Sequence, residues 1–139
     1  MIILLDLNYT LVSNSQEKIK PFARQIDNER YSSDLLSRIK DRTVILITAR
    51  PKLHKDRTLQ SIRYKTGWLP QDAYFNEWFL TPPSCKKKIL EKYIFPKYGA
   101  NPESYVAIES NPSTRAMYEK LGIVALTRDT VLETFQPKD

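Results

Sequence analysis

The chain has 139 residues, of which 41% are hydrophobic and 27% charged, and its formal net charge is +6. This composition is typical of one globular domain over residues 1–139, and no stretch approaches the ~20 apolar residues of a membrane span. The single cysteine, Cys85, excludes an internal disulfide, and the single histidine, His54, argues against the usual zinc sites and a Ser-His-Asp triad. We expect a cytoplasmic location, because the apolar start lacks a basic leader and contains Asp6. We also expect a monomer.

Four short runs of apolar, often branched residues predict strands, and a fifth stretch is a further candidate. None of the four alternates regularly with polar residues, which is typical of parallel strands that are covered on both faces. The four runs are IILLDL (2–7), TVILIT (43–48), YVAIES (105–110) and GIVAL (122–126), and the further candidate is AYFNEWFL (73–80).

Helical patterns lie between these strands, over residues 33–40, 52–65, 84–98 and 112–121. The last one has clear boundaries: Asn111 suits an N-cap, Pro112 the first helical position, and Gly122 the position after the end. Strands that alternate with helices predict a doubly wound α/β fold, a three-layer α/β/α sandwich with a mainly parallel sheet. We find no repeat or linker.

Three polar residues are expected at the same edge of this sheet. Asp6, Thr48 and Glu109 stand at the carboxyl ends of predicted strands, where ligands bind in open α/β sheets. Each also has a structural interpretation: a turn-forming aspartate, a hydroxyl at a strand end, and an acid before a helix N-terminus. Their convergence favours a functional site.

The motifs around these residues resemble those of the haloacid dehalogenase (HAD) superfamily of phosphohydrolases. The first is an apolar strand followed by DLNYT, where the superfamily has Asp-x-Asp-x-Thr, and the second is VILITAR. The third is the lysine-bearing helix start PPSCKKKIL, and the fourth is VAIESN. Within the superfamily, the short motifs are most similar to the 3′-phosphatase domain of phage polynucleotide kinase.

The resemblance implies a mechanism and a cofactor. Asp6 would attack phosphorus and form an aspartyl-phosphate, which divides one difficult step into two. Mg²⁺ would offset the repulsion between the carboxylate and the phosphate, with Asp6, the backbone carbonyl of Asn8 and Glu109 as its protein ligands.

The remaining motif positions would contact the phosphate. Thr48 and the backbone N–H of Ala49 would hold phosphoryl oxygens, with Thr10 completing the first motif. Lys86 would neutralise charge on the phosphate and on Asp6. It is the lysine expected to face the sheet, because it lies three and four residues before the apolar pair at 89 and 90, on the same helix face. Arg50 is either a phosphate clamp or a solvated loop residue.

The chain departs from the superfamily pattern at three places. Asn8 replaces the aspartate that serves as general acid and base, and an amide cannot donate that proton. Tyr9 replaces the usual glycine, where it would crowd the site or stack over it. The usual acidic pair is Glu109 followed by Ser110.

Two functions remain open from the sequence. The first is an Mg²⁺-dependent phosphomonoesterase without a cap domain, acting on an exposed phosphate such as a polynucleotide 3′ end, a partner that the positive charge favours. The second is a catalytically weakened HAD-fold module with a binding or regulatory role. Asn8, Tyr9 and Ser110 favour the module, whereas Asp6, Thr48 and Lys86 favour the enzyme.

Overall fold

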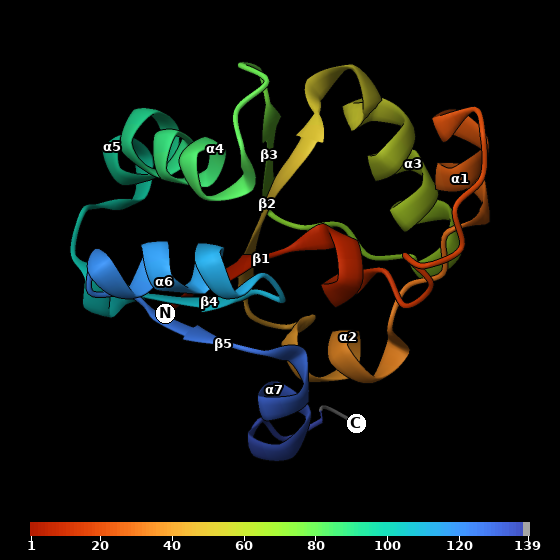
Figure 1. Cartoon of the computed structure of the whole chain (residues 1–139). Helices are drawn as coiled ribbons and strands as arrows, with labels where there is room; N and C mark the ends of the chain where they lie inside the picture. The colour runs from red at the N-terminus through yellow and green to blue at the C-terminus, as the bar shows by residue number, and fades with distance from the viewer. Residues whose placement is uncertain (138–139) are drawn as a thin grey trace.

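The computed structural model describes residues 1–137, which form a five-stranded sheet in the order β3-β2-β1-β4-β5. Every pairing between these strands is parallel, so the predicted α/β class with a parallel sheet is confirmed (Figure 1). The strands are β1 (Ile2–Leu5), β2 (Thr43–Pro51), β3 (Asp72–Asn76), β4 (Tyr105–Ile108) and β5 (Val124–Leu126).

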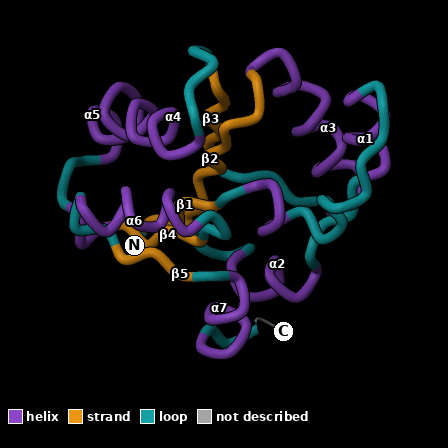
Figure 2. Tube along the Cα trace, in the orientation of Figure 1, coloured by secondary structure: helices purple, strands orange, loops and turns teal. Residues whose placement is uncertain are grey.

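Helices cover both faces of the sheet and produce three layers, as Figure 2 shows. One side carries α1 (Phe22–Asn28), α2 (Ser33–Ile39), α3 (Lys55–Thr66) and α7 (Arg128–Thr134). The other carries α4 (Pro82–Ile89), a π-helical turn (Leu90–Ile94), α5 (Phe95–Tyr98) and α6 (Pro112–Lys120). Shorter turns occupy Leu7–Leu11, Lys52–His54 and Pro102–Ser104.

The central strand β1 is apolar along its length because each of its faces packs into a separate core. Ile3 and Leu5 belong to the core beneath α2, α3 and α7, whereas Leu4 belongs to the core beneath α4 and α6. Successive side chains of a strand point to opposite faces, so a strand covered on both sides needs no polar alternation.

Several predicted boundaries need correction. Strand β1 ends at Leu5 rather than 7, and β4 ends at Ile108 rather than 110. Strand β2 continues to Pro51, beyond the predicted end at 48, although its register with β3 shifts after Ile47. Strand β3 ends at Asn76, so residues 77–80 are not a strand. The predicted helix at 84–98 begins at Pro82, and the one at 52–65 starts with a separate 3-10 turn.

Helices α1 and α7 were not predicted. Both have seven residues and few buried apolar side chains: Ile26 in α1 and Val131 in α7. Such short segments give almost no periodic signal. Among residues 1–137, the structure has no helix with the length and apolar character that a membrane crossing requires.

Candidate active site

The carboxyl ends of β1, β2 and β4 lie near the start of α4 (Figure 1). A pocket of about 190 Å³ is lined by residues at these ends. Asp6, Thr48 and Glu109 all line it, so the three predicted strand-end residues converge in the structure. The complete lining is Asp6, Asn8, Tyr9, Thr48, Ala49, Pro82, Lys86, Glu109, Ser110 and Asn111.

Asp6 is a buried carboxylate that several donors orient. Its backbone N–H donates to the carbonyl of Ile108, 3.0 Å away, which places it directly after β1 and beside β4. Its Oδ2 accepts from Thr10 Oγ1 at 2.7 Å and from Ser110 Oγ at 3.1 Å. Burial would raise the pKa of Asp6, but the charge of Lys86 and hydrogen bonds with Glu109, Lys86 and Thr10 hold that pKa below its ordinary value. The carboxylate is therefore ionised at neutral pH.

Lys86 joins the two acidic residues of the pocket. Its Nζ donates to Asp6 Oδ1 at 2.8 Å and to Glu109 Oε1 at 2.5 Å, and the residue is 2% exposed. Burial acts to lower the pKa of Lys86, but the two carboxylates outweigh it and raise that pKa. Lys87 and Lys88 are exposed, so the prediction from helical spacing that Lys86 faces the sheet is confirmed.

Glu109 has a different electrostatic environment from Asp6. Its Oε2 accepts from the backbone N–H of Asn111 at 3.0 Å. Burial raises the pKa of Glu109 to about 7, since the charge of Lys86 offsets this only in part and the charge of Asp6 adds to it. Of the two carboxyl groups, Asp6 has the lower pKa and therefore stays ionised to a lower pH.

Arg50 does not line the pocket, where a phosphate clamp was one expectation, and its burial shows that it is not the solvated loop residue that was the other. Its guanidinium is buried and forms a two-pronged pair with Glu29, through Nη1 at 3.0 Å and Nη2 at 2.5 Å. Nη1 also donates to Thr58 Oγ1 at 2.9 Å, and Nη2 donates to Asn8 Oδ1 at 2.8 Å. The planar group stacks on the ring of Phe22, 4.9 Å from its centroid. All four terminal N–H groups of Arg50 therefore have partners within the protein, and one of these partners is Asn8.

This contact fixes the orientation of the Asn8 side chain. A guanidinium only donates, so the oxygen of the amide must face Arg50, and the amide NH₂ is directed away from it. Asn8 lines the pocket, and its side chain can therefore offer a hydrogen-bond donor there. It cannot supply a titratable proton.

Tyr9, Thr10 and Thr48 occupy three distinct places. Tyr9 lines the rim with 52% exposure, has a φ of 60°, and its N–H donates to Ser15 Oγ at 2.8 Å. Thr10 is buried and supports Asp6, rather than facing the pocket. Thr48 Oγ1 accepts from the N–H of Arg50 at 3.1 Å, so its own hydroxyl hydrogen remains available to an anion in the pocket.

Oxygen atoms of the kind that a small, hard cation prefers lie around Asp6. Ser110 Oγ lies 3.1 Å from Asp6 Oδ2 and 3.4 Å from the carbonyl oxygen of Asn8. The hydroxyl of Ser110 therefore contacts two of the expected metal ligands. Mg²⁺ takes one or two carboxylates and completes its shell with waters and phosphate. Within residues 1–137 no three acidic, histidine or cysteine side chains gather as a metal cluster.

Two supporting residues were missed by reasoning from sequence. Glu29 lies 21 positions before Arg50 and has no motif of its own, so only the fold reveals the pair. Arg115 on α6 donates to the carbonyls of Glu109 and Ser110 at 3.1 and 2.9 Å, and thereby holds the loop after β4.

No protein-family model and no curated protein sequence matches this chain.

Proposed function

We propose that the protein is an Mg²⁺-dependent phosphomonoesterase that works through an aspartyl-phosphate on Asp6. The observation that carries this proposal is a buried, ionised carboxylate that Thr10 and Lys86 orient in a pocket at the sheet edge. Such a carboxylate is a competent nucleophile because its lone pairs are fixed before the substrate arrives.

The reaction has two displacements. In the first, an Asp6 oxygen forms a bond to phosphorus while the ester P–O bond breaks, and the leaving oxygen takes its proton from water because Asn8 has none to give. In the second, water attacks the same phosphorus, the Asp6–phosphorus bond breaks, and phosphate and the free carboxylate result. Lys86 and the Thr48 hydroxyl offset the charge on the phosphoryl oxygens.

Mg²⁺ would be held by Asp6, the carbonyl of Asn8 and Glu109, with Ser110 adjacent. When bound, it supplies positive charge against the phosphate and the leaving oxygen. Lys86 contacts the same two carboxylates, so it keeps them close together before a cation arrives.

We propose a polynucleotide 3′-phosphate end as the substrate. The site is a small pocket with an exposed aromatic rim at Tyr9, and the chain carries a net charge of +6. A phosphate at the end of a strand enters such a pocket while the rest of the polymer stays outside it, where basic residues meet the backbone.

The test is hydrolysis of a generic aryl phosphate with and without Mg²⁺. An aryl leaving group needs little protonation, so it suits an enzyme that has no general acid. We expect Mg²⁺-dependent turnover in the parent protein, loss of turnover in Asp6→Asn, and parent rates in the exposed control Asp34→Asn. Acid quenching should trap labelled phosphate on Asp6. Parent-level turnover by Asp6→Asn would overturn the mechanism.

A second candidate is a phosphate-binding module with little turnover. The observation that favours it is the amide of Asn8, held by Arg50 where a general acid would act. In that case phosphate or vanadate with Mg²⁺ would raise the melting temperature of the parent protein, and aryl phosphate would remain unhydrolysed.

A further inference from the structure

Two exposed aromatic residues have unusual backbone conformations at the edge of the sheet that holds the pocket. Among residues 1–137, the non-glycine residues with positive φ are Tyr9, at 60°, and Phe79, at 54°. Their exposed fractions are 52% and 91%. Bulky residues rarely adopt this conformation, and an observed outlier of this kind is a reason to consider function.

Phe79 lies in the loop of residues 77–81, which follows β3 and leads into α4 (Figure 1). This loop is anchored at both ends: Asn76 Nδ2 donates to the carbonyl of Leu80 at 2.9 Å, and the N–H of Trp78 donates to Asn76 Oδ1 at 3.0 Å. Glu77 accepts from the Tyr93 hydroxyl at 2.5 Å. The loop therefore presents the ring of Phe79 from a fixed base.

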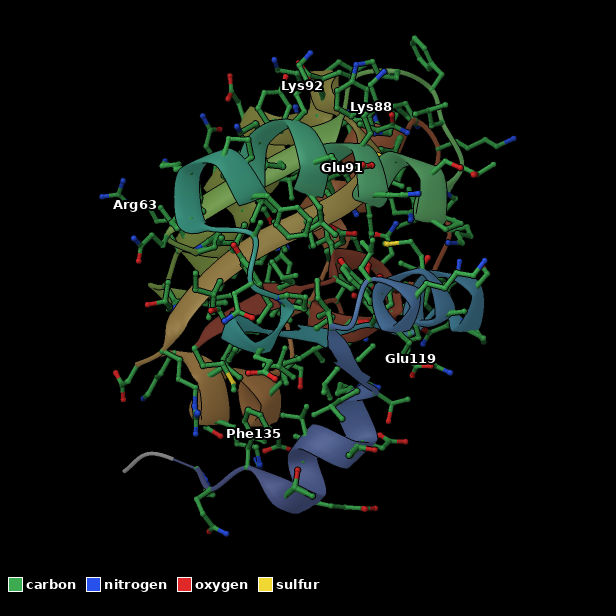
Figure 3. All side chains as sticks on the ribbon, turned by 90° about the vertical axis from the view of Figure 1, so that its left-hand side faces the viewer. Arg63, Lys88, Glu91, Lys92, Glu119 and Phe135 are labelled. Atoms are coloured by element: carbon green, nitrogen blue, oxygen red, sulfur yellow. The ribbon has the colours of Figure 1, made fainter. Side chains whose placement is uncertain are left out.

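Aromatic rings and lysines alternate beside this loop. Trp78 stacks on Tyr93 at 6.3 Å between centroids. Lys88 and Lys92 lie 4.8 and 5.6 Å from the ring of Trp78, and Figure 3 shows both lysines on the outer side of the helical segment that begins with α4. The exposed charged residues of that segment, 82–98, are Lys87, Lys88, Lys92, Lys97 and Glu91.

We propose that Trp78, Phe79, Tyr93, Lys88 and Lys92, here called the aromatic–lysine surface, bind an unpaired nucleic acid strand. The inference rests on the proposed function, because the strand's terminal phosphate occupies the pocket. Pro82, which lines the pocket, follows Phe79 by three residues along the chain, so a strand whose end enters the pocket can extend toward this surface.

The chemistry of this surface selects unpaired bases over other polyanions. Aromatic rings stack on the faces of bases, which a duplex hides, and lysines neutralise backbone phosphates. An acidic peptide would use the lysines but would gain nothing from the exposed ring of Phe79. A single strand uses both.

The experiment measures binding of a fluorescein-labelled thymidine oligonucleotide with a 3′-phosphate, by anisotropy, without Mg²⁺ so that no turnover occurs. We expect Phe79→Ala to weaken binding ~5- to 150-fold, the range for loss of one base-stacking contact. The double variant Lys88→Gln/Lys92→Gln should make the slope of log K against log salt less negative by ~1.4. The 91% exposure of Phe79 means that its truncation leaves the fold unchanged, which a melting curve verifies.

Matched controls are Tyr64→Ala, at 89% exposure, and Lys40→Gln/Arg63→Gln, both of which should bind as the parent does. Figure 3 places Arg63 away from Lys88 and Lys92. The proposal is overturned if the oligonucleotide does not bind, if a blunt duplex binds as tightly, or if Phe79→Ala changes binding no more than Tyr64→Ala. Absence of aryl phosphate hydrolysis in the parent would overturn the proposed function alone, since strand binding is measured without turnover.

Discussion

Replacing Arg50 by methionine should destabilise the protein strongly and release the Asn8 side chain from its contact with the guanidinium. The substitution removes the guanidinium and leaves the Glu29 carboxylate, whose side chain is 3% exposed, without its cation. Breaking a buried pair in this way costs about 3–5 kcal/mol, because the remaining charge is desolvated. For a domain with a stability of about 5–15 kcal/mol, the loss corresponds to a fall of roughly 10–20 °C in melting temperature.

Urea unfolding of four proteins measures this effect. Arg50→Met should lose about 3–5 kcal/mol, and the double variant Glu29→Gln/Arg50→Met should recover much of that loss because no isolated charge remains. The matched control is Arg57→Met, since Arg57 forms a similar two-pronged pair with Asp27, with contacts of 3.0 and 2.6 Å. That pair is about half exposed, at 49% and 54%, so its loss should cost less than about 1 kcal/mol.

The opposite pattern would refute the buried-pair interpretation. If Arg50 binds substrate phosphate, Arg50→Met would raise KM by a large factor and unfold at the same urea concentration as the parent. A double variant no more stable than Arg50→Met would also contradict the reasoning.

Three further predictions concern single positions. Rates of the parent should depend steeply on leaving-group pKa. Asn8→Asp should raise alkyl ester hydrolysis by less than ~10²-fold, because Arg50 Nη2, 2.8 Å from the Asn8 side-chain oxygen, would keep the new carboxylate ionised. A larger gain would show that Arg50 does not hold that carboxylate ionised. Burial raises the pKa of the Cys85 thiol to about 11, so at pH 8 its thiolate fraction is roughly 200-fold below that of a free cysteine. Alkylation should therefore be slow in the folded protein, increase up to about pH 11, and become fast in urea; rapid labelling of the folded protein at pH 8 would exclude this environment. Gly122→Ala should destabilise the protein by about 1–2 kcal/mol in urea, because Gly122 has a φ of 83° and a new Cβ would lie 3.2 Å from Pro102; unchanged stability would show that the turn adapts.

The parallel sheet could be predicted because its strands carry strong local signals. Runs such as Ile2–Leu5 contain little besides branched apolar residues, and both faces of β1 are in fact covered. Helix α7 could have been found from its cap, since Thr127 accepts from the N–H of Thr130. Helix α1 begins after Pro21 and has polar residues at most positions, so its packing against α3 gives no sequence signal.

Residues of the candidate site could be predicted when their place follows from the strand or helix that carries them. Asp6 and Glu109 directly follow strands, and Lys86 follows from helical spacing. Arg50 could not be placed this way, since its direction depends on Glu29 at the end of α1, a helix that was not predicted. Its place after Thr48 made it resemble a clamp, but the side chain pairs with Glu29 and does not line the pocket.

The Arg50–Glu29 pair also gives a physical reason for an amide at position 8. Glu29 already balances the charge of Arg50, so an amide oxygen satisfies the remaining donor of Nη2 without adding a second buried negative charge. A carboxylate in that place would have to share the guanidinium with Glu29 and would lie close to the ionised Asp6, where like charges oppose one another. An amide at position 8 thus suits these surroundings, but it leaves no titratable group there beside Asp6, the proposed nucleophile. Under the proposed mechanism water must then protonate the leaving oxygen, so an alkyl ester such as a polynucleotide 3′-phosphate should be hydrolysed more slowly than an aryl phosphate.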